Sequence, residues 1–189
     1  AEMYASGHSE ELLGQAVRES GIPREELFIT SKVSASHLRY GDLLSSFENS
    51  LRHLGMDYLN LYLIHWPSRG IPLSETFRAL NQLVREGRVR YLGLSNFDVE
   101  LMKQTQAESE TPIFTNQVPY SLEDRSYVRN SVLEYCQKND ILLTAYSPVE
   151  EGRLRVSPVM KTIADAHNAT PYQIALVWLV AQPRGITIP

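Results

Sequence analysis

The sequence predicts an α/β fold, and more narrowly a (β/α)8 TIM barrel, from three observations. Strand-like and helix-like segments alternate without a break along the 189 residues. A new strand begins roughly every 30 residues, the length of one βαβ unit. Most strands end in polar residues, as in barrels that gather a site from many strand ends. An open nucleotide-binding sheet would instead carry G-x-G-x-x-G after its first strand, and this motif does not occur.

Strands are expected where β-branched, aliphatic and aromatic residues cluster between turn residues. The segment Tyr58–Pro67 is rich in large apolar residues but too short to span a membrane. Pro67 ends it, because proline cannot donate a hydrogen bond to a neighbouring strand. We therefore expect a fully buried strand here, with His65 and Trp66 at its end. The other expected strands are residues 27–33, 89–95, 113–120, 141–147 and 186–189.

Helices are expected between the strands, where apolar residues recur at helical spacing. Each helix is predicted to start at a side chain that can accept a hydrogen bond from the first turn. Glycines end the first three helices, and residues 126–138 form one continuous helix. The expected capping residues are Ser9, Asp42, Ser74, Asp98, Ser157 and Thr170, the last two followed by proline at the first helical position.

Six strands are too few to close an eight-stranded barrel. We therefore expect residues 1–189 to form a single but incomplete barrel domain, lacking the first strands and the C-terminal segment. Such a set of strands would expose two edges and the inner barrel layer, an arrangement prone to aggregation. We accordingly expect that the 189 residues alone do not make a stable, active enzyme. Soluble, monomeric and active protein from this span would refute that expectation.

The composition is that of an ordinary globular protein, with 43% hydrophobic and 21% charged residues. The formal net charge is -4 and no run of Lys or Arg occurs, which argues against a nucleic-acid partner. No apolar run has membrane length. Cys136 is the single cysteine, which excludes a disulfide framework and Cys-based metal centres. We expect a cytoplasmic protein that acts on a small molecule.

Lys32 and His65 are expected at the ends of neighbouring strands, and three kinds of chemistry compete there. A metallohydrolase needs several ligands at strand ends, and His65 is the only histidine so placed. Lys32 could form a Schiff base, as in an aldolase-like barrel. Alternatively, the Lys32 ammonium could lower the pKa of a phenol, which would turn Tyr4 into a general acid.

Seven short motifs are spaced along essentially the whole chain: AEMY at 1–4, GHSEELLG at 7–14, FITSKV at 28–33, LIHWP at 63–67, GLSNF at 93–97, NQVPY at 116–120 and AYSP at 145–148. In their order and spacing, these motifs resemble the aldo-keto reductases. The resemblance implies a (β/α)8 barrel that reduces aldehydes and ketones to alcohols by hydride transfer from NADPH, without metal or flavin.

The resemblance also implies a role for individual residues. Tyr4 would be the proton donor, Lys32 would lower the pKa of Tyr4, and His65 would orient the carbonyl group. Trp66 would line the substrate pocket. Ser95, Asn96 and Gln117 would hydrogen-bond the nicotinamide carboxamide, Tyr146 would stack on the nicotinamide ring, and Ser147, Pro148 and Val149 would cover the pyrophosphate.

The chain departs from the family pattern in three respects. The family's catalytic aspartate would lie two positions before Ala1, and the segment that binds the NADPH 2′-phosphate would follow the last strand, so both fall outside this sequence. Ala5 stands where the family usually has glycine, with little expected effect on the chemistry. Two alternatives remain: an aldolase-like barrel using Lys32, and a non-catalytic cofactor-sensing module. We expect the full-length protein to be a monomer.

Overall fold

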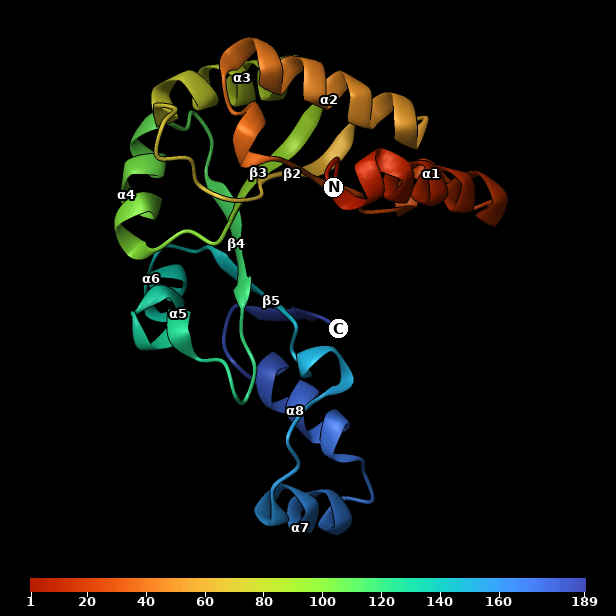
Figure 1. The fold of residues 1–189 in the computed structure, drawn as a ribbon, viewed down its shortest axis with the longest axis vertical. Coiled ribbons are helices and arrows are strands. Elements are labelled where there is room, and N and C mark those ends of the chain that lie inside the picture. The colour runs from red at the N-terminus through yellow and green to blue at the C-terminus, as the bar shows by residue number, and fades with distance from the viewer. The chain divides into compact units, whose positions relative to one another are not determined.

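The computed structural model describes residues 1–189, which divide into two compact units. The first unit contains residues 1–95 and 101–113, and the second contains residues 96–100 and 114–189. Each unit combines parallel strands with the helices that connect them (Figure 1). The alternation of strands and helices along the chain is therefore as the sequence predicts.

The first unit is built on the parallel strands β1 (Thr30–Val33), β2 (Leu59–Ile64) and β3 (Val89–Ser95). Every residue of β2 is buried, which confirms the prediction for this segment. The main helices are α1 (His8–Ser20), α2 (Tyr40–Leu54) and α3 (Leu73–Arg85). Helices α2 and α3 run along the same side of β2 and β3 (Figure 1). Short 3-10 turns lie at η1 (Tyr4–Gly7), η2 (Arg24–Glu26) and η3 (Ala35–His37).

The second unit contains the parallel strands β5 (Leu142–Tyr146) and β6 (Gly185–Ile188) and most of β4 (Ile113–Pro119). Helix α6 packs against β5, helix α8 packs against β6, and α7 packs against α8. Helix α4 begins at residues assigned to this unit and continues in the first. The helices are α4 (Val99–Glu108), α5 (Ser126–Arg129), α6 (Val132–Lys138), α7 (Pro158–Ala166) and α8 (Pro171–Val180), with a 3-10 turn at η4 (Glu150–Gly152).

The helix starts were predicted with mixed success. Ser157 and Thr170 accept hydrogen bonds from the first turns of α7 and α8, which confirms both caps. Ser9, Asp42 and Ser74 were wrong as caps, because α1, α2 and α3 begin one or two residues before them. The residues before these helices are Gly7, Arg39 and Pro72, and none of them offers a side-chain hydrogen bond to the first turn. The predicted single helix over 126–138 is two helices, separated where Ser131 has a φ of 62°.

One face of the first unit's strands carries both apolar and polar side chains. Side chains alternate along a strand, so Thr30 and Lys32 of β1 point to the same face, and Phe28 lies just before this strand. The Phe28 ring stacks on Tyr91 with ring centroids 6.1 Å apart. Both rings are about half exposed.

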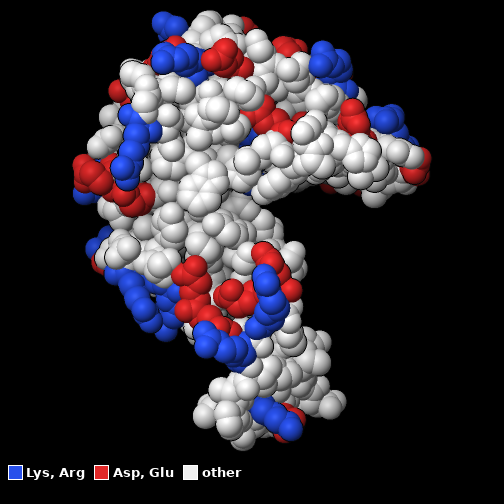
Figure 2. Space-filling model, viewed as in Figure 1, with Lys and Arg blue, Asp and Glu red and all other residues white.

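The surface and the helices add two further observations. Acidic and basic side chains are interspersed on the face shown in Figure 2, in keeping with the small net charge of -4. None of the helices combines the length and the apolar character that crossing a bilayer requires.

Candidate active site

The first unit brings Tyr4, Lys32 and His65 together from three segments. In the parallel register Lys32 lies opposite Leu63, and the His65 backbone N–H donates to the Val33 carbonyl oxygen at 3.0 Å. Lys32 and His65 therefore emerge from adjacent strands. The Tyr4 hydroxyl lies 3.4 Å from His65 Nε2, with the two rings at 88°. Lys32 Nζ lies 5.5 Å from the centre of the Tyr4 ring.

Burial sets the charge states of this group. His65 is 8% exposed, and burial, with a further contribution from the positive charge of Lys32, lowers the pKa of His65 to about 4. The imidazole is therefore neutral at neutral pH, with one ring nitrogen protonated. Burial also lowers the pKa of Lys32. A phenol, an ammonium and a neutral imidazole thus meet within hydrogen-bonding or cation–π range.

The group is accessible from one side. Tyr4 is 48% exposed, and Trp66, directly after His65, is 46% exposed. A ligand can therefore reach the phenol and the indole without moving the core of the unit. The predicted roles of Tyr4, Lys32, His65 and Trp66 stay predictions, but the structure does place the first three side by side.

The backbone after Tyr4 is in an uncommon conformation. Ala5 and Ser6 have φ values of 48° and 52°, and Gly7 has a φ of 91°. Left-handed backbone is unfavourable for residues with a Cβ atom. A side chain at position 7 would also lie 2.6 Å from the His53 ring, so Gly7 is required for this close approach. The glycine usual in the family at position 5 would fit the left-handed turn without strain.

The second unit gathers the predicted nicotinamide-binding residues that follow β3. Asn96 and Gln117 are 5% and 4% exposed, and the Asn96 N–H donates to the Gln117 carbonyl oxygen at 2.9 Å. The Tyr146 hydroxyl donates to Asn96 Oδ1 at 3.0 Å, and the Tyr127 hydroxyl donates to the Asn96 carbonyl oxygen at 3.3 Å. The φ of Asn96 is 65°, a conformation that asparagine tolerates better than most residues. Ser95, the last residue of β3, is buried and belongs to the first unit.

Asn116 is a supporting residue that sequence reasoning did not single out. It is fully buried in β4, where its Nδ2 donates to the Phe97 carbonyl oxygen at 2.8 Å. Its Oδ1 accepts from the Phe97 N–H at 3.4 Å. One amide therefore holds both backbone groups of the residue after Asn96. The sequence feature that could have identified Asn116 is the Asn116-Gln117 pair inside an otherwise apolar strand, because buried amides need specific hydrogen-bond partners.

The segment after β5 lies beside a charged hollow. A cavity of about 210 Å³ is lined by Glu123, Ser147, Glu150, Glu151 and Arg153. Arg153 pairs with Glu151 at 2.5 Å, and both side chains are largely exposed. Pro148 is buried, and Val149 packs against the apolar cluster of Leu154, Met160 and Ala175. The predicted contact of Ser147, Pro148 and Val149 with a pyrophosphate stays a prediction.

Cys136 behaves as a core residue. It is fully buried in α6, and burial raises the pKa of its thiol to about 12, so the reactive thiolate is not populated at neutral pH. No group of three or more His, Cys, Asp or Glu side chains is arranged to hold a metal ion.

The alternation of elements and the polar strand ends are those of an α/β protein of the (β/α)8-barrel class. The chain belongs to the aldo/keto reductase family, since the model of the Aldo/keto reductase family matches residues 1–189. This confirms the family and the fold class that the sequence motifs predict.

Individual relatives support the same assignment. The chain is 39% identical over 181 residues to glyoxal reductase of Bacillus subtilis (strain 168), covering 96% of this chain and 64% of that protein. The crystal structure of the thermostable aldo-keto reductase Tm1743 with the inhibitor epalrestat has a TM-score of 0.96 and 48% identity, covering 100% of this chain and 69% of that one. An aldo/keto reductase from Klebsiella pneumoniae, solved with NADP and acetate, has a TM-score of 0.90 and 37% identity, covering 100% and 67%. The chain thus spans about two thirds of these proteins.

Proposed function

We propose that the protein containing this chain reduces aldehydes and ketones to alcohols, with NADPH as the hydride donor and Tyr4 as the proton donor. The observation that carries the proposal is the meeting of the Tyr4 hydroxyl with His65 Nε2 at 3.4 Å, beside the Lys32 ammonium. Family membership supports it, as do the relatives named glyoxal reductase and the neighbour solved with NADP.

The chemistry follows from where charge develops. Bound NADPH supplies a hydride to the carbonyl carbon, and negative charge then grows on the carbonyl oxygen. The Tyr4 hydroxyl gives its proton to that oxygen and leaves a phenolate, which the Lys32 ammonium stabilises. Neutral His65 offers an Nε2–H donor to the same oxygen and so fixes its position. The pKa of His65, about 4, means that the imidazole does not compete as an acid near neutral pH.

The second unit provides groups suited to the nicotinamide. Asn96 and Gln117 are buried amides, which carry both donors and acceptors and so complement a carboxamide. The Tyr146 hydroxyl donates a hydrogen bond to Asn96 Oδ1, which orients the Asn96 amide. The face of the Tyr146 ring can then stack on the nicotinamide. We assign NADPH binding to Ser95, Asn96, Gln117 and Tyr146, with Ser147, Pro148 and Val149 near the pyrophosphate. We further expect a monomeric, cytoplasmic enzyme.

The test uses the complete protein with NADPH and glyoxal. NADPH titration followed by protein fluorescence should show saturable binding, and loss of NADPH absorbance should follow addition of glyoxal. Replacing Tyr4 by Phe should keep the binding and remove the turnover. The proposal would be wrong if the protein did not bind NADPH at about millimolar concentration, or if the Tyr4→Phe variant kept full turnover.

One property of Lys32 also fits a competing function, that of an aldolase-like barrel with a Schiff-base lysine. Burial lowers the pKa of Lys32, as a Schiff-base lysine would also require. The contact between Tyr4 and His65 has no place in that chemistry, whereas carbonyl reduction uses it. Borohydride trapping of glyceraldehyde on Lys32 would support the aldolase-like alternative. Cofactor binding without turnover of simple aldehydes would support a sensing module.

A further inference from the structure

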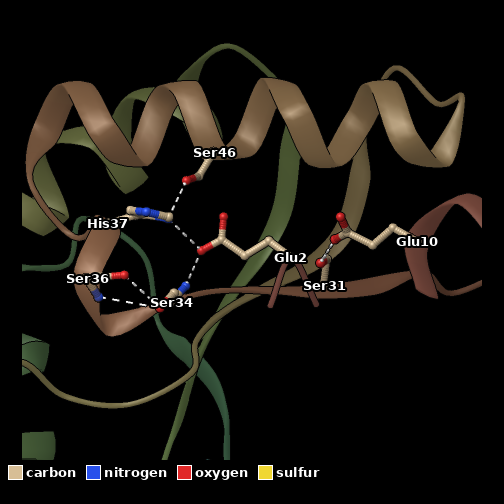
Figure 3. A network of polar contacts seen from close by, with 7 residues as sticks. All are labelled: Glu2, Glu10, Ser31, Ser34, Ser36, His37 and Ser46. Atoms are coloured by element: carbon tan, nitrogen blue, oxygen red, sulfur yellow. Dashed lines mark hydrogen bonds and ion pairs between the residues drawn. The ribbon is translucent and has the colours of Figure 1, made fainter. Parts of the chain in front are cut away.

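Two carboxylates that the proposed chemistry does not use flank Tyr4 in the sequence. Glu2 precedes Tyr4 by two residues, and its side chain is 14% exposed. Glu10 follows in α1 and is 2% exposed. Carboxylates are rarely buried without partners that offset their desolvation. Each of them has a partner on β1 or the turn that follows it, the segment that carries Lys32 (Figure 3).

Glu2 joins the Tyr4 segment to the turn after β1. Its Oε1 accepts from the backbone N–H of Ser34 at 2.5 Å and lies 3.1 Å from His37 Nδ1. The same Nδ1 lies 3.0 Å from the Ser46 hydroxyl of α2. A carboxylate can only accept, so His37 carries a proton on Nδ1, where it faces both oxygens. Figure 3 shows these residues as one continuous network.

Glu10 forms a second connection on the other side of Lys32. Its Oε1 accepts from the Ser31 hydroxyl at 2.5 Å, and its Oε2 lies 3.6 Å from His53 Nδ1. Ser31 precedes Lys32 and Ser34 follows it by two residues. The two carboxylates therefore bracket Tyr4 in one segment and attach to points that bracket Lys32 in the other.

The strained turn after Tyr4 explains why such attachments matter. Ala5 and Ser6 both have left-handed φ values, followed by Gly7 at 91°. Residues in this conformation persist only where the surrounding structure fixes them. Glu10 lies beyond this turn, in α1, whereas Glu2 lies on the same side of it as Tyr4. Glu2 is thus the nearer of the two attachments to the phenol.

From this arrangement we propose that Glu2, through Ser34 and His37, is a positioning residue that holds the Tyr4 phenol in place relative to Lys32 and His65. The inference rests on the proposed role of Tyr4 and adds a residue to that site. Glu2 does not touch the reacting atoms; it acts through the backbone that carries Tyr4. A residue that only stabilises the fold would change the amount of active enzyme, whereas a positioning residue changes the rate per folded molecule.

The experiment compares three variants of the complete protein, with glyoxal and NADPH as probes. In Glu2→Ala, kcat should fall about 10- to 100-fold, because small displacements of a reacting group are costly. The KM for glyoxal and the Kd for NADPH should stay unchanged. In Glu2→Gln, kcat should stay within about threefold of wild type, because the amide oxygen can accept the same two hydrogen bonds more weakly.

Glu11→Ala is the matched control. Glu11 also lies 3.1 Å from a histidine nitrogen, that of His8, but both side chains are exposed on α1 and neither reaches β1. Its kcat should equal that of wild type. If Glu2→Ala is poorly folded, it is combined with Ala5→Gly, which relieves the left-handed strain. The combined variant should regain thermal stability but not kcat.

The outcomes separate this inference from the proposed function. An active wild type, an inactive Tyr4→Phe and an unchanged kcat in Glu2→Ala would overturn the inference alone. Recovery of wild-type kcat in the combined variant would also overturn it, because stability would then account for the loss. A wild type that does not reduce glyoxal with NADPH, or a fully active Tyr4→Phe, would overturn the proposed function and the inference with it.

Discussion

The two units hold side chains of different chemical character in the candidate site. In the first unit, Tyr4, Lys32 and His65 are all titratable, and burial lowers the pKa of both Lys32 and His65. In the second unit, the candidate site contains the buried neutral amides of Asn96, Asn116 and Gln117, and hydrogen bonds fix those of Asn96 and Asn116. Titratable groups move protons, whereas neutral amides recognise a polar ligand without changing charge. In the proposed function, the first unit supplies the proton-transfer groups, and the second unit supplies the cofactor-binding groups other than Ser95.

The sharpest test of this division is the Tyr4→Phe variant. Loss of the proton donor should lower kcat by about 100- to 10,000-fold, the usual contribution of a general acid. The Kd for NADPH should not change, because no predicted cofactor contact is removed. Stopped-flow or steady-state turnover with glyoxal, alongside NADPH titration, measures both. If the Kd for NADPH rose together with the loss of kcat, proton transfer and cofactor binding would not be separate functions of the two units.

The converse test replaces Asn96 by Gly, which also accepts the φ of 65°. The change removes the amide that receives the Tyr146 hydroxyl, and we expect NADPH binding to weaken about 10- to 100-fold. The value of kcat at saturating NADPH should fall much less. Asn130→Gly, a change on the exposed surface of the same unit, serves as the control. Equal Kd values for the Asn96→Gly variant and wild type would remove Asn96 from the cofactor site.

The titratable character of the first unit predicts a pH effect on stability. The pKa of His65 is about 4 in the folded chain, below its usual value of about 6.5 in an unfolded one. The unfolded chain therefore binds more protons between these values, so stability falls as pH drops through that window. Near pH 5 the loss attributable to His65 should be about 2 kcal/mol.

Urea unfolding of the complete protein at about pH 7.5 and about pH 5 measures this loss. The His65→Gln variant should lose about 2 kcal/mol less than wild type over the same interval. His8→Gln is the control, because His8 is largely exposed on α1. An equal loss in wild type and His65→Gln would show that burial of His65 does not govern the pH response.

The smallest expected effect concerns the turn that presents Tyr4. Ala5→Gly removes left-handed strain but adds freedom to the unfolded chain, so the free energy of unfolding should rise by about 0.5–1 kcal/mol. The KM and kcat should stay close to wild type. Thermal or urea unfolding checks the stability. A destabilised Ala5→Gly variant would show that position 5 is not left-handed in solution.

Much of the fold and part of the candidate site follow from the sequence. The apolar run before His65 and the alternation of elements predict β2 and its neighbours, because strand patterns are local. The starts of α1, α2 and α3 were misplaced, because no side chain caps them. The contacts of Glu2 and Glu10 escaped prediction, because their partners on or just after β1 lie 21 to 35 residues away. Nothing local in a sequence marks such a pairing.

The sequence by itself determined which residues stand at the strand ends, because side-chain periodicity and proline placement act within a few residues. The choice of Tyr4, Lys32 and His65 as candidate site residues therefore needs only the order of amino acids. Only the tertiary structure decided that the Tyr4 hydroxyl meets His65 Nε2 across 61 residues of sequence. It also decided that His65 is neutral, because desolvation depends on every segment packed around the ring.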